Sequence, residues 1–439
     1  MRLAIVNWNR RKIAGTENYL SSLIPELHRL GHSIALWHER DEPPGRERIE
    51  LPDGSPGWCV AELGRERALT ALRQWQPDLI FANSFVDPEV EAETLNIAPA
   101  VFFAHAYYGT CVSQAKTFKY PVVRVCNRTF GLGCLLHYYP HRCGGLSPIT
   151  MWQQYRLQSQ RLENLRRYHA IITFSKHMRN EYIGHGFSPD RVHCLSSAID
   201  CGGNEAFKSG ENGTLRSASI NSDGEDHCVK SPRSETLPKR CWRIAFLGRM
   251  EFLKGGHILL DALPQVSATL DCELRVTFAG EGPQRQLWQR KGEYLQSQLK
   301  GLSIEFLGWI EKPEVEMLLE NCDLLVMPSL WPEPFGLVGL EAGDHGVPTA
   351  AFAVGGITDW LIDGVNGYTA PANPAAAAGL AEAIIKCLAD SARHDSLRRG
   401  AARIAQQFTL QAQATALLEV FDKVTRESRA QGTVSSSEP

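Results

Sequence analysis

The sequence lacks the features that would place it among membrane-spanning, secreted or strongly charged proteins. No apolar run reaches the ~18 residues that a membrane-spanning helix needs. The chain turns polar directly after residues 3–6, too soon for a secretory signal, and we interpret these residues as a first buried strand. A net charge of −3 favours no particular partner, while 43% apolar and 22% charged residues are typical of a globular protein. We therefore expect a cytoplasmic location.

The twelve cysteines include no C-x-x-C pair, the spacing that makes a zinc site a strong prediction. Without a secretory signal they do not suit a secreted disulfide scaffold either. Four of them nevertheless fall in one loop-like stretch with two histidines interleaved. They are Cys111, Cys126, Cys134 and Cys143, with His137 and His141. Three alternatives stay open for these four residues: a structural zinc site, a disulfide pair, or free thiols.

Short apolar runs alternate with longer segments of helical period, which predicts βα units, parallel sheets and an α/β fold. At 439 residues the chain exceeds a single core, and two such blocks are visible, over residues 1–207 and 241–408. The segment 208–240 between them is rich in Ser, Gly, Asn and charge, so we expect a disordered linker or insertion. A last helix is expected at 409–427, followed by a flexible tail at 428–439.

The expected strands are the short apolar runs of each block. Those of the first block are Ser33–Trp37, Leu79–Phe81, Ala100–Phe103 and Ala170–Phe174. Those of the second block are Arg243–Leu247, Glu273–Ala279, Ile304–Leu307, Leu324–Met327 and Thr349–Phe352. Expected helices of the first block include Glu17–Leu30 and Arg65–Trp75. Open α/β sheets bind ligands at the carboxyl ends of their strands, so we expect the site there.

Two carboxylates, Glu333 and Glu341, flank a loop that should turn into a helix, with seven residues between them. Pro332 and Pro334 prevent helix upstream and favour an extended approach. Gly336 allows a ligand to approach the N–H groups of the first helical turn, where the macrodipole attracts anions. Carboxylates instead bind hydroxyls. The arrangement suits a diphosphate with sugar hydroxyls on both sides; the alternative is an ordinary loop–helix junction with two solvated glutamates.

Around this pair the sequence resembles the retaining glycosyltransferases of family four, the glycosyl transferases group 1 with the GT-B fold, over most of the chain. Five segments carry the resemblance in the order of the family. They are Leu247–Gly255, the glycine-rich Ala279–Pro283, Phe306–Ile310, Trp331–Glu341 and the segment Gly355–Gly367. The resemblance implies two Rossmann-like domains that face each other across a cleft. It also implies transfer from a nucleoside-diphosphate sugar to a saccharide or polyprenyl-linked acceptor, in surface polysaccharide or glycoconjugate assembly. The alternative is a non-catalytic scaffold of the same fold that binds a nucleotide sugar or a glycan.

The resemblance assigns the donor site to the second domain. Arg249 and Lys254 would stabilise the charge that develops on the departing diphosphate. Glu333 would bind the donor sugar and Glu341 the ribose hydroxyls. The other expected donor-binding residues are Gly248, Glu281, Ile310, Phe335, Gly336, Leu337 and Val338. Gly336, Leu337 and Val338 would offer backbone N–H groups to the phosphates.

The chain contains no Asp-x-Asp sequence of the kind that holds a divalent ion in the other large glycosyltransferase fold. We therefore expect a metal-independent reaction that requires no cofactor. Retention of configuration follows from the resemblance, as does same-face attack in which the leaving phosphate takes the acceptor proton. Glu333 is then a hydroxyl ligand and not a nucleophile.

The first domain is expected to bind the acceptor and to contribute two residues to the cleft. Gly15 lies in Ala14-Gly15-Thr16-Glu17, which resembles the family's Gly-Gly-x-Glu turn with alanine for the first glycine. His105 follows an expected strand, where the family has a histidine near the reacting centre and where it can exchange a hydrogen bond with a sugar hydroxyl near neutral pH. The stretch at about 108–150 is expected to be a Cys-rich insertion that shapes the acceptor pocket or a lid.

Two further features leave alternatives open. Asp344 and His345 stand where relatives carry small or apolar residues, and either face the cleft or pair with each other. Residues 116–179 hold a predicted basic patch against one acid, Glu163. Its members are Lys116, Lys119, Arg124, Arg128, Arg142, Arg156, Arg161, Arg166, Arg167, Lys176 and Arg179. The patch could contact an anionic membrane surface, giving a peripheral location at the inner face, or hold an acidic or diphosphate-linked acceptor; otherwise it is balanced by acids elsewhere. No nucleic-acid-binding motif accompanies it.

Overall fold

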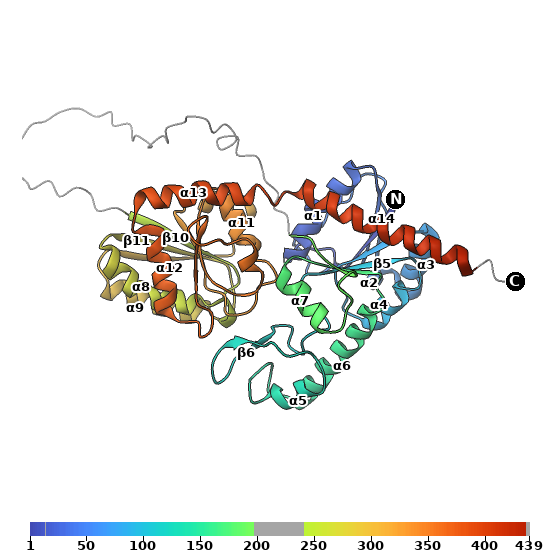
Figure 1. Cartoon of the computed structure of the whole chain (residues 1–439), viewed down its shortest axis with the longest axis horizontal. Coiled ribbons are helices and arrows are strands. Elements are labelled where there is room, and N and C mark those ends of the chain that lie inside the picture. Colours follow the sequence, from blue (N-terminus) through green and yellow to red (C-terminus); the bar gives the residue numbers. More distant parts are fainter. Residues whose placement is uncertain (14, 197–240, 436–439) are drawn as a thin grey trace, which may run out of the picture.

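The computed structural model describes residues 1–13, 15–196 and 241–435, with side chains as far as residue 430. Ala14, the predicted linker at 208–240 and residues 436–439 of the predicted tail lie outside this description. The described chain forms two α/β domains side by side, each built on a parallel sheet (Figure 1). The predicted α/β class is confirmed.

The first domain holds a seven-stranded sheet of order β3-β2-β1-β4-β5-β8-β9, parallel throughout. Its strands are β1 Arg2–Asn9, β2 Ser33–Arg40, β3 Gly57–Cys59, β4 Leu79–Ala82, β5 Ala100–Ala104, β8 Ala170–Thr173 and β9 Val192–Cys194. Its helices are α1 Gly15–Arg29, α2 Val60–Leu63, α3 Arg65–Trp75, α4 Pro88–Thr94, α6 Pro148–Leu165 and α7 Lys176–Gly184. Every expected strand and helix of this block is present.

The second domain holds a six-stranded parallel sheet of order β12-β11-β10-β13-β14-β15. Its strands are β10 Cys241–Leu247, β11 Glu273–Ala279, β12 Leu302–Gly308, β13 Leu324–Met327, β14 Thr349–Phe352 and β15 Gly367–Ala370. Its helices are η2 Phe252–Lys254, α8 Gly256–Leu270, α9 Arg285–Gln298, α10 Lys312–Glu320, α11 Leu337–Asp344, η3 Gly355–Asp359, α12 Ala377–Leu388 and α13 Ser391–Ala405. The expected strands at β11, β13 and β14 match to the residue.

Continuous apolar strands explain why helices cover both faces of each sheet. All four residues of β4 and of β13 are buried. Along β1, alternate side chains enter two separate cores: Leu3 and Ile5 join one, and Ala4 and Val6 the other. Because successive side chains of a strand point to opposite faces, each face must be covered, as in parallel sheets with helical crossovers.

The last helix, α14 Leu410–Ser435, lies along the first domain although it follows the second (Figure 1). The ring of Phe421 packs 5.0 Å from that of Phe81, and Gln413 Nε2 donates to the Ser196 carbonyl at 2.9 Å. Arg429 forms an ion pair with Asp78 at 2.9 Å. The helix therefore continues past residue 427, where the flexible tail was expected to begin, and Arg429 still contacts the first domain.

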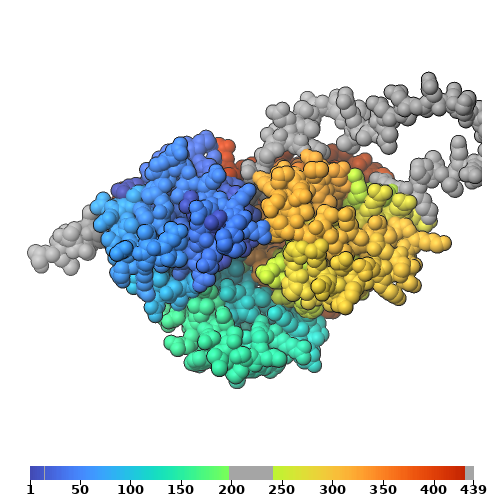
Figure 2. All heavy atoms as spheres, turned by 180° about the vertical axis from the view of Figure 1, so that it is seen from behind, coloured from blue at the N-terminus to red at the C-terminus, as the bar shows by residue number. Residues whose placement is uncertain are grey.

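Residues 109–147, between β5 and α6, form what we call the insertion, a lobe at one end of the first domain (teal in Figures 1 and 2). Its regular structure consists of the antiparallel strands β6 Thr117–Phe118 and β7 Arg124–Val125 and the helix α5 Gly133–Tyr138. Figure 2 shows that the lobe lies against the seam where the two domains meet. None of the described helices is long and apolar enough to cross a membrane.

Candidate active site

Glycines join the loops that follow β10, β11 and β12 at the carboxyl edge of the second sheet. Gly248 has φ +143°, and its N–H donates to the Ala279 carbonyl at 3.0 Å. A Cβ on Gly280 would lie 2.1 Å from the Gly248 carbonyl oxygen, so no larger residue fits there. Met250 N–H donates to the Glu281 carbonyl at 2.8 Å. Backbone hydrogen bonds therefore join two of the predicted donor segments, the loop after β10 and the loop after β11.

A second contact positions Lys254. Gly255 ends η2 in the left-handed conformation, with φ +70°, and a Cβ there would lie 1.8 Å from the Pro328 carbonyl oxygen. Close by, Leu330 N–H donates to the Leu253 carbonyl at 2.7 Å. The turn that carries Lys254 is thus pressed against the segment that follows β13, which leads into the predicted glutamate loop.

Lys254 and Glu333, far apart in sequence, form a direct ion pair with Nζ and Oε1 2.6 Å apart. Ser329 Oγ donates to the same Oε1 at 2.6 Å, and the Lys254 ammonium lies 5.3 Å from the centroid of the Trp331 ring. Glu333 is only 5% exposed, so the lysine and the hydroxyl compensate a carboxylate that burial would otherwise destabilise. Both contacts fall on Oε1.

The predicted loop-to-helix junction is confirmed. Gly336 adopts φ +87° and α11 begins directly after it, so the N–H groups of Leu337 and Val338 belong to the first turn. Trp360 fixes the junction: its Nε1 donates to the Phe335 carbonyl at 2.7 Å, and its ring leaves no room for a Cβ on Gly339.

Glu341 lies on the same helix and is exposed to solvent. Surrounding protein nevertheless desolvates the carboxyl and raises its pKa. A carboxylate that solvent can reach is able to accept a hydrogen bond from a ligand hydroxyl.

Asp344 and His345 close α11, about 10 Å from its first turn. The helix therefore separates them from the amides of the junction. No ion pair joins them among the residues that the structure covers, so the predicted pairing has no support.

Other predicted donor residues lie on the same edge but away from the ion pair. Arg249 contacts Glu251, with Nε 3.0 Å from Oε1, and its side chain is 71% exposed. Glu281, in the loop before α9, pairs with Arg285 at the start of that helix. Ile310 is half-buried. The structure thus brings Lys254 to Glu333 but leaves Arg249 pointing into solvent beside its own acid.

His105 follows β5 at the carboxyl edge of the first sheet, and its Nε2 lies 2.8 Å from Asn83 Oδ1. Three rings enclose it: Phe103 at 4.8 Å, Phe174 at 5.0 Å and Tyr19 at 5.7 Å. This desolvation lowers the pKa of His105 to about 3, so the imidazole is neutral near pH 7 and does not titrate there.

Gly15 begins α1 and is exposed, with neither a left-handed φ nor any atom near a virtual Cβ. Glu17, two residues later, is fully buried and accepts from Asn7 Nδ2 at 3.0 Å and Trp8 Nε1 at 2.9 Å. The residue that organises this turn is therefore the glutamate, and Gly15 itself meets no steric requirement for glycine.

Several contacts join the two domains, and two of the residues involved, Tyr107 and His177, were not singled out from the sequence. Tyr107 Oη donates to the Pro332 carbonyl at 2.7 Å and lies 3.0 Å from His177 Nε2. Lys176 N–H donates to Asp359 Oδ2 at 2.6 Å. The ring of Phe174, which touches His105, also lies 6.3 Å from that of Phe335. Tyr107 follows His105 by two residues in the loop after β5, and this position was the one sequence signal that could have identified it.

The predicted basic patch is partly structural. Lys116 is buried and pairs with Glu181 at 2.5 Å. Arg161 is buried too, and it donates to the Phe85 carbonyl at 2.8 Å over the Tyr108 ring. Arg124, Arg128, Arg142, Arg156, Arg166, Arg167 and Lys176 remain exposed.

The four clustered cysteines form no disulfide in the structure, and all four line one cavity of about 30 Å³. A larger cavity of about 190 Å³ lies on the amino-terminal halves of β10, β11 and β12, lined by residues such as Arg243, Arg275 and Ser303. That position is remote from the carboxyl-edge residues, and it therefore has no part in the candidate site.

Two family models match the chain. The model described as Glycosyltransferase Family 4 matches residues 13–202, and the one described as Glycosyl transferases group 1 matches residues 242–390. A glycogen synthase of Mycobacterium tuberculosis is 34% identical over 191 residues, which cover 42% of this chain and 44% of the relative. A D-inositol 3-phosphate glycosyltransferase of Salinispora tropica is 31% identical over 207 residues, covering 46% and 42%. The chain thus spans less than half the length of these curated relatives.

Solved structures resemble the whole chain. HepE of Anabaena in complex with UDP and glucose has a TM-score of 0.61 at 18% identity, covering 96% of this chain and 100% of that one. Sucrose-phosphate synthase of Thermosynechococcus elongatus has a TM-score of 0.65 at 17% identity, covering 97% and 99%. These likenesses confirm the GT-B fold. With both domains matched by its family models, the chain belongs to glycosyltransferase family four.

Proposed function

We propose that the protein is a retaining, metal-independent, hexosyltransferase-like glycosyltransferase. It moves a sugar from a nucleoside-diphosphate sugar to a saccharide or polyprenyl-linked acceptor, in the assembly of surface polysaccharide or another glycoconjugate. The observation that carries this proposal is the ion pair between Lys254 and Glu333, held beside the first turn of α11. This arrangement places a cation, a carboxylate that can accept a hydrogen bond from a hydroxyl, and the first backbone amides of α11 in neighbouring loops.

The donor phosphates fit the first turn of α11. The N–H groups of Leu337 and Val338 and the positive end of the helix favour an anion there. Lys254 has three N–H donors, so it can hold Glu333 and still donate to a phosphate oxygen. HepE is solved with UDP, and we expect a nucleoside diphosphate at the corresponding edge of this chain.

Glu333 is suited to binding a sugar hydroxyl and not to nucleophilic attack. Its Oε1 already accepts from Lys254 and Ser329, and the remaining oxygen can accept from a hydroxyl of the donor sugar. In the proposed step the bond from the anomeric carbon to the leaving phosphate oxygen breaks. The acceptor oxygen forms its new bond on the same face, and the acceptor proton passes to that phosphate oxygen.

Cationic groups and amides would replace a divalent ion. Charge develops on the distal phosphate as the glycosidic bond breaks, and donors fixed before the reaction stabilise it most. Lys254 is held in place for this role, and Arg249 on the same loop is free to swing from Glu251 toward the ligand because its side chain is 71% exposed. The lack of an Asp-x-Asp sequence supports this metal-independent scheme.

A lipid-linked acceptor and contact with an anionic membrane surface are supported by the insertion and the start of α6. Several large apolar side chains there are exposed, among them Leu132 at 71%, Leu136 at 79% and Leu146 at 82%. Exposed cations, including Arg124 and Arg142, lie in the same lobe. Apolar side chains with basic residues around them are the combination that binds the surface of anionic bilayers.

The first test is thermal unfolding with UDP, GDP and ADP and their common sugars, each with and without a chelator. A ligand at about a hundred times its dissociation constant adds about 2.7 kcal/mol of stability. We expect a shift with one base, unaffected by chelation, and slow hydrolysis of the matching nucleotide sugar. A shift without any turnover over a panel of acceptors would favour the non-catalytic scaffold, and no shift with any nucleotide would contradict both.

A further inference from the structure

The insertion has too little apolar burial to hold itself together. Over residues 109–147 its buried apolar side chains are Val112, Phe118 and Tyr138. Burying each such side chain contributes about 1.5–3 kcal/mol, whereas ordering each residue of backbone costs about 1–2 kcal/mol. Its longest regular element is the six-residue α5. Cross-links and bound ions are the usual means by which a segment with so small a core is stabilised.

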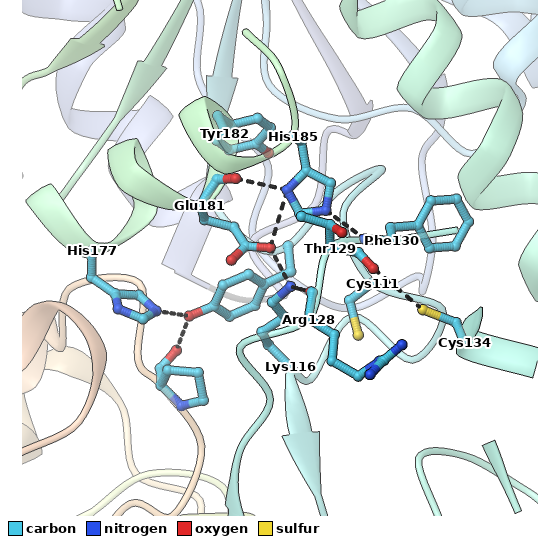
Figure 3. A network of polar contacts seen from close by, with 12 residues as sticks. Cys111, Lys116, Arg128, Thr129, Phe130, Cys134, His177, Glu181, Tyr182 and His185 are labelled. Carbon is cyan, nitrogen blue, oxygen red and sulfur yellow. Dashed lines mark hydrogen bonds and ion pairs between the residues drawn. The ribbon is translucent and has the colours of Figure 1, made fainter. Parts of the chain in front are cut away.

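Four cysteines spread along the insertion converge on one point. Cys111, Cys126, Cys134 and Cys143 all line the cavity of about 30 Å³, together with His137 and Arg128. They come from the start of the lobe, the end of β7, the helix α5 and the loop before α6. Figure 3 shows the thiols of Cys111 and Cys134 near the Arg128 side chain.

Three of the four thiols make only long, weak polar contacts in the structure. Cys134 Sγ lies 3.9 Å from the Thr129 carbonyl oxygen, Cys143 Sγ 3.8 Å from that of His137, and Cys111 Sγ 3.5 Å from Ser113 Oγ. Four crowded, desolvated thiols gain little from one another, and a cation among them would stabilise their ionised form.

The charge around the cavity suits an anionic metal centre. A zinc ion with four thiolates carries a net charge of −2, and the sequence contains no Asp or Glu between Glu93 and Glu163. The Arg128 side chain lines the cavity and supplies positive charge beside it. The positive charge of this segment would therefore also balance the negative charge of a zinc ion with four thiolates.

We propose that Cys111, Cys126, Cys134 and Cys143 bind one zinc ion that holds the insertion together. Zinc takes four thiolates at about 2.3 Å in tetrahedral geometry, and each thiol gives up its proton on binding. No group of three or more His, Cys, Asp or Glu in the described chain is already arranged around a metal position. Binding therefore requires the four side chains to turn into the cavity that they line.

The insertion is joined to the donor loop through α7 (Figure 3). Lys116 pairs with Glu181 at 2.5 Å, and Phe130 N–H donates to His185 Nε2 at 2.7 Å. At the other end of α7, His177 contacts Tyr107, whose hydroxyl donates to the Pro332 carbonyl. A zinc ion that orders the insertion would therefore also stabilise the positions of α7 and of Tyr107 beside the candidate active site. The metal assignment itself does not rest on glycosyl transfer.

The test is the metal content of the full-length chain, purified under reducing conditions without a metal-binding tag. We expect about one zinc per chain by mass spectrometry, and loss of nearly all of it in Cys134→Ser and in Cys143→Ser. Cys241→Ser, a half-buried cysteine outside the insertion, is the matched control and should keep its zinc.

Because the cluster variants could fail to fold, a second measurement uses the wild-type protein. Cobalt exchanged for zinc should give the strong visible absorption of a tetrahedral thiolate site, and zinc-loaded cysteines should resist alkylation until a chelator is added. Zinc-free protein with four reactive thiols, a disulfide between any two of them, or bound iron in place of zinc would each overturn the proposal.

Discussion

The glutamate loop and the insertion border the same domain seam, but they are held in place by different means. The segment around Glu333 and Gly336 is fixed by buried backbone contacts in which glycines are required, such as Gly255 against the Pro328 carbonyl. The insertion is fixed by polar and ionic contacts, such as Lys116 with Glu181, around few buried apolar side chains. We therefore expect few substitutions to be tolerated at the closely packed glycines. In the insertion, we expect stability to depend on individual ion pairs and hydrogen bonds.

The largest expected effect comes from removing the cation of the first region. Lys254→Ala leaves Glu333 buried without its counter-charge. It also removes the donor that we propose for the leaving diphosphate. We expect turnover to fall by about 10²–10³-fold or more, the loss typical of removing one fixed transition-state donor. Steady-state kinetics on the nucleotide sugar measure it.

The matched control for this variant is Lys386→Ala, an exposed lysine paired with Glu382 at 2.8 Å on α12, which should keep normal activity. Wild-type turnover in Lys254→Ala would remove Lys254 from the mechanism.

A pair of glycine substitutions compares the two regions directly. In Gly255→Ala the new Cβ would clash with a backbone carbonyl at 1.8 Å and would also force a left-handed φ on alanine, so we expect a loss of about 3–4 kcal/mol. In the insertion, Gly131→Ala places its Cβ where no atom lies within 4 Å, and we expect less than about 0.5 kcal/mol. Urea unfolding gives both values. Equal losses would contradict the distinction between the regions.

Glu181→Gln tests the polar support of the insertion. The amide keeps a hydrogen bond to Lys116 but leaves a buried ammonium, whose side chain is 3% exposed, without its counter-charge. We expect a local loss of about 2–3 kcal/mol. Limited proteolysis within residues 109–147 should therefore speed up roughly 30-fold or more in proportion. Glu89→Gln, an exposed acid 3.3 Å from Arg65, is the control and should leave the cleavage rate unchanged.

Features set by local sequence signals were predicted, whereas contacts that depend on how distant loops and domains pack were not. The strands and the junction at Gly336 were predictable because apolar runs, prolines and glycines act locally. The pairing of Lys254 with Glu333 was not, since both had been assigned to different parts of the ligand and their contact depends on how two loops pack. Tyr107 and His177 were missed for the same reason: their roles arise only when the domains meet.

His105 shows a limit of residue type as a guide to chemistry. A histidine suggests titration near neutral pH, yet the surrounding rings lower the pKa of His105 to about 3. The folded pKa lies below the unfolded value of about 6.5, so the unfolded chain binds more protons between these values and stability is lost as pH falls through that window. From pH 6.5 to 5 we expect a loss of at most about 2 kcal/mol. His105→Gln should lack this share of the slope in urea unfolding at several pH values.

The smallest expected effect concerns the contact that joins the two regions. Tyr107→Phe keeps the buried ring but removes the hydroxyl that donates to the Pro332 carbonyl and touches His177. One buried hydrogen bond is worth about 1 kcal/mol, so we expect a modest loss of stability and a severalfold weaker binding of the nucleotide. Because α7 carries both His177 and Glu181, the double variant with Glu181→Gln decides whether the regions are coupled. Additive losses would mean that the insertion and the glutamate loop are independent, whereas a combined loss that differs from the sum would show that α7 transmits the state of one region to the other.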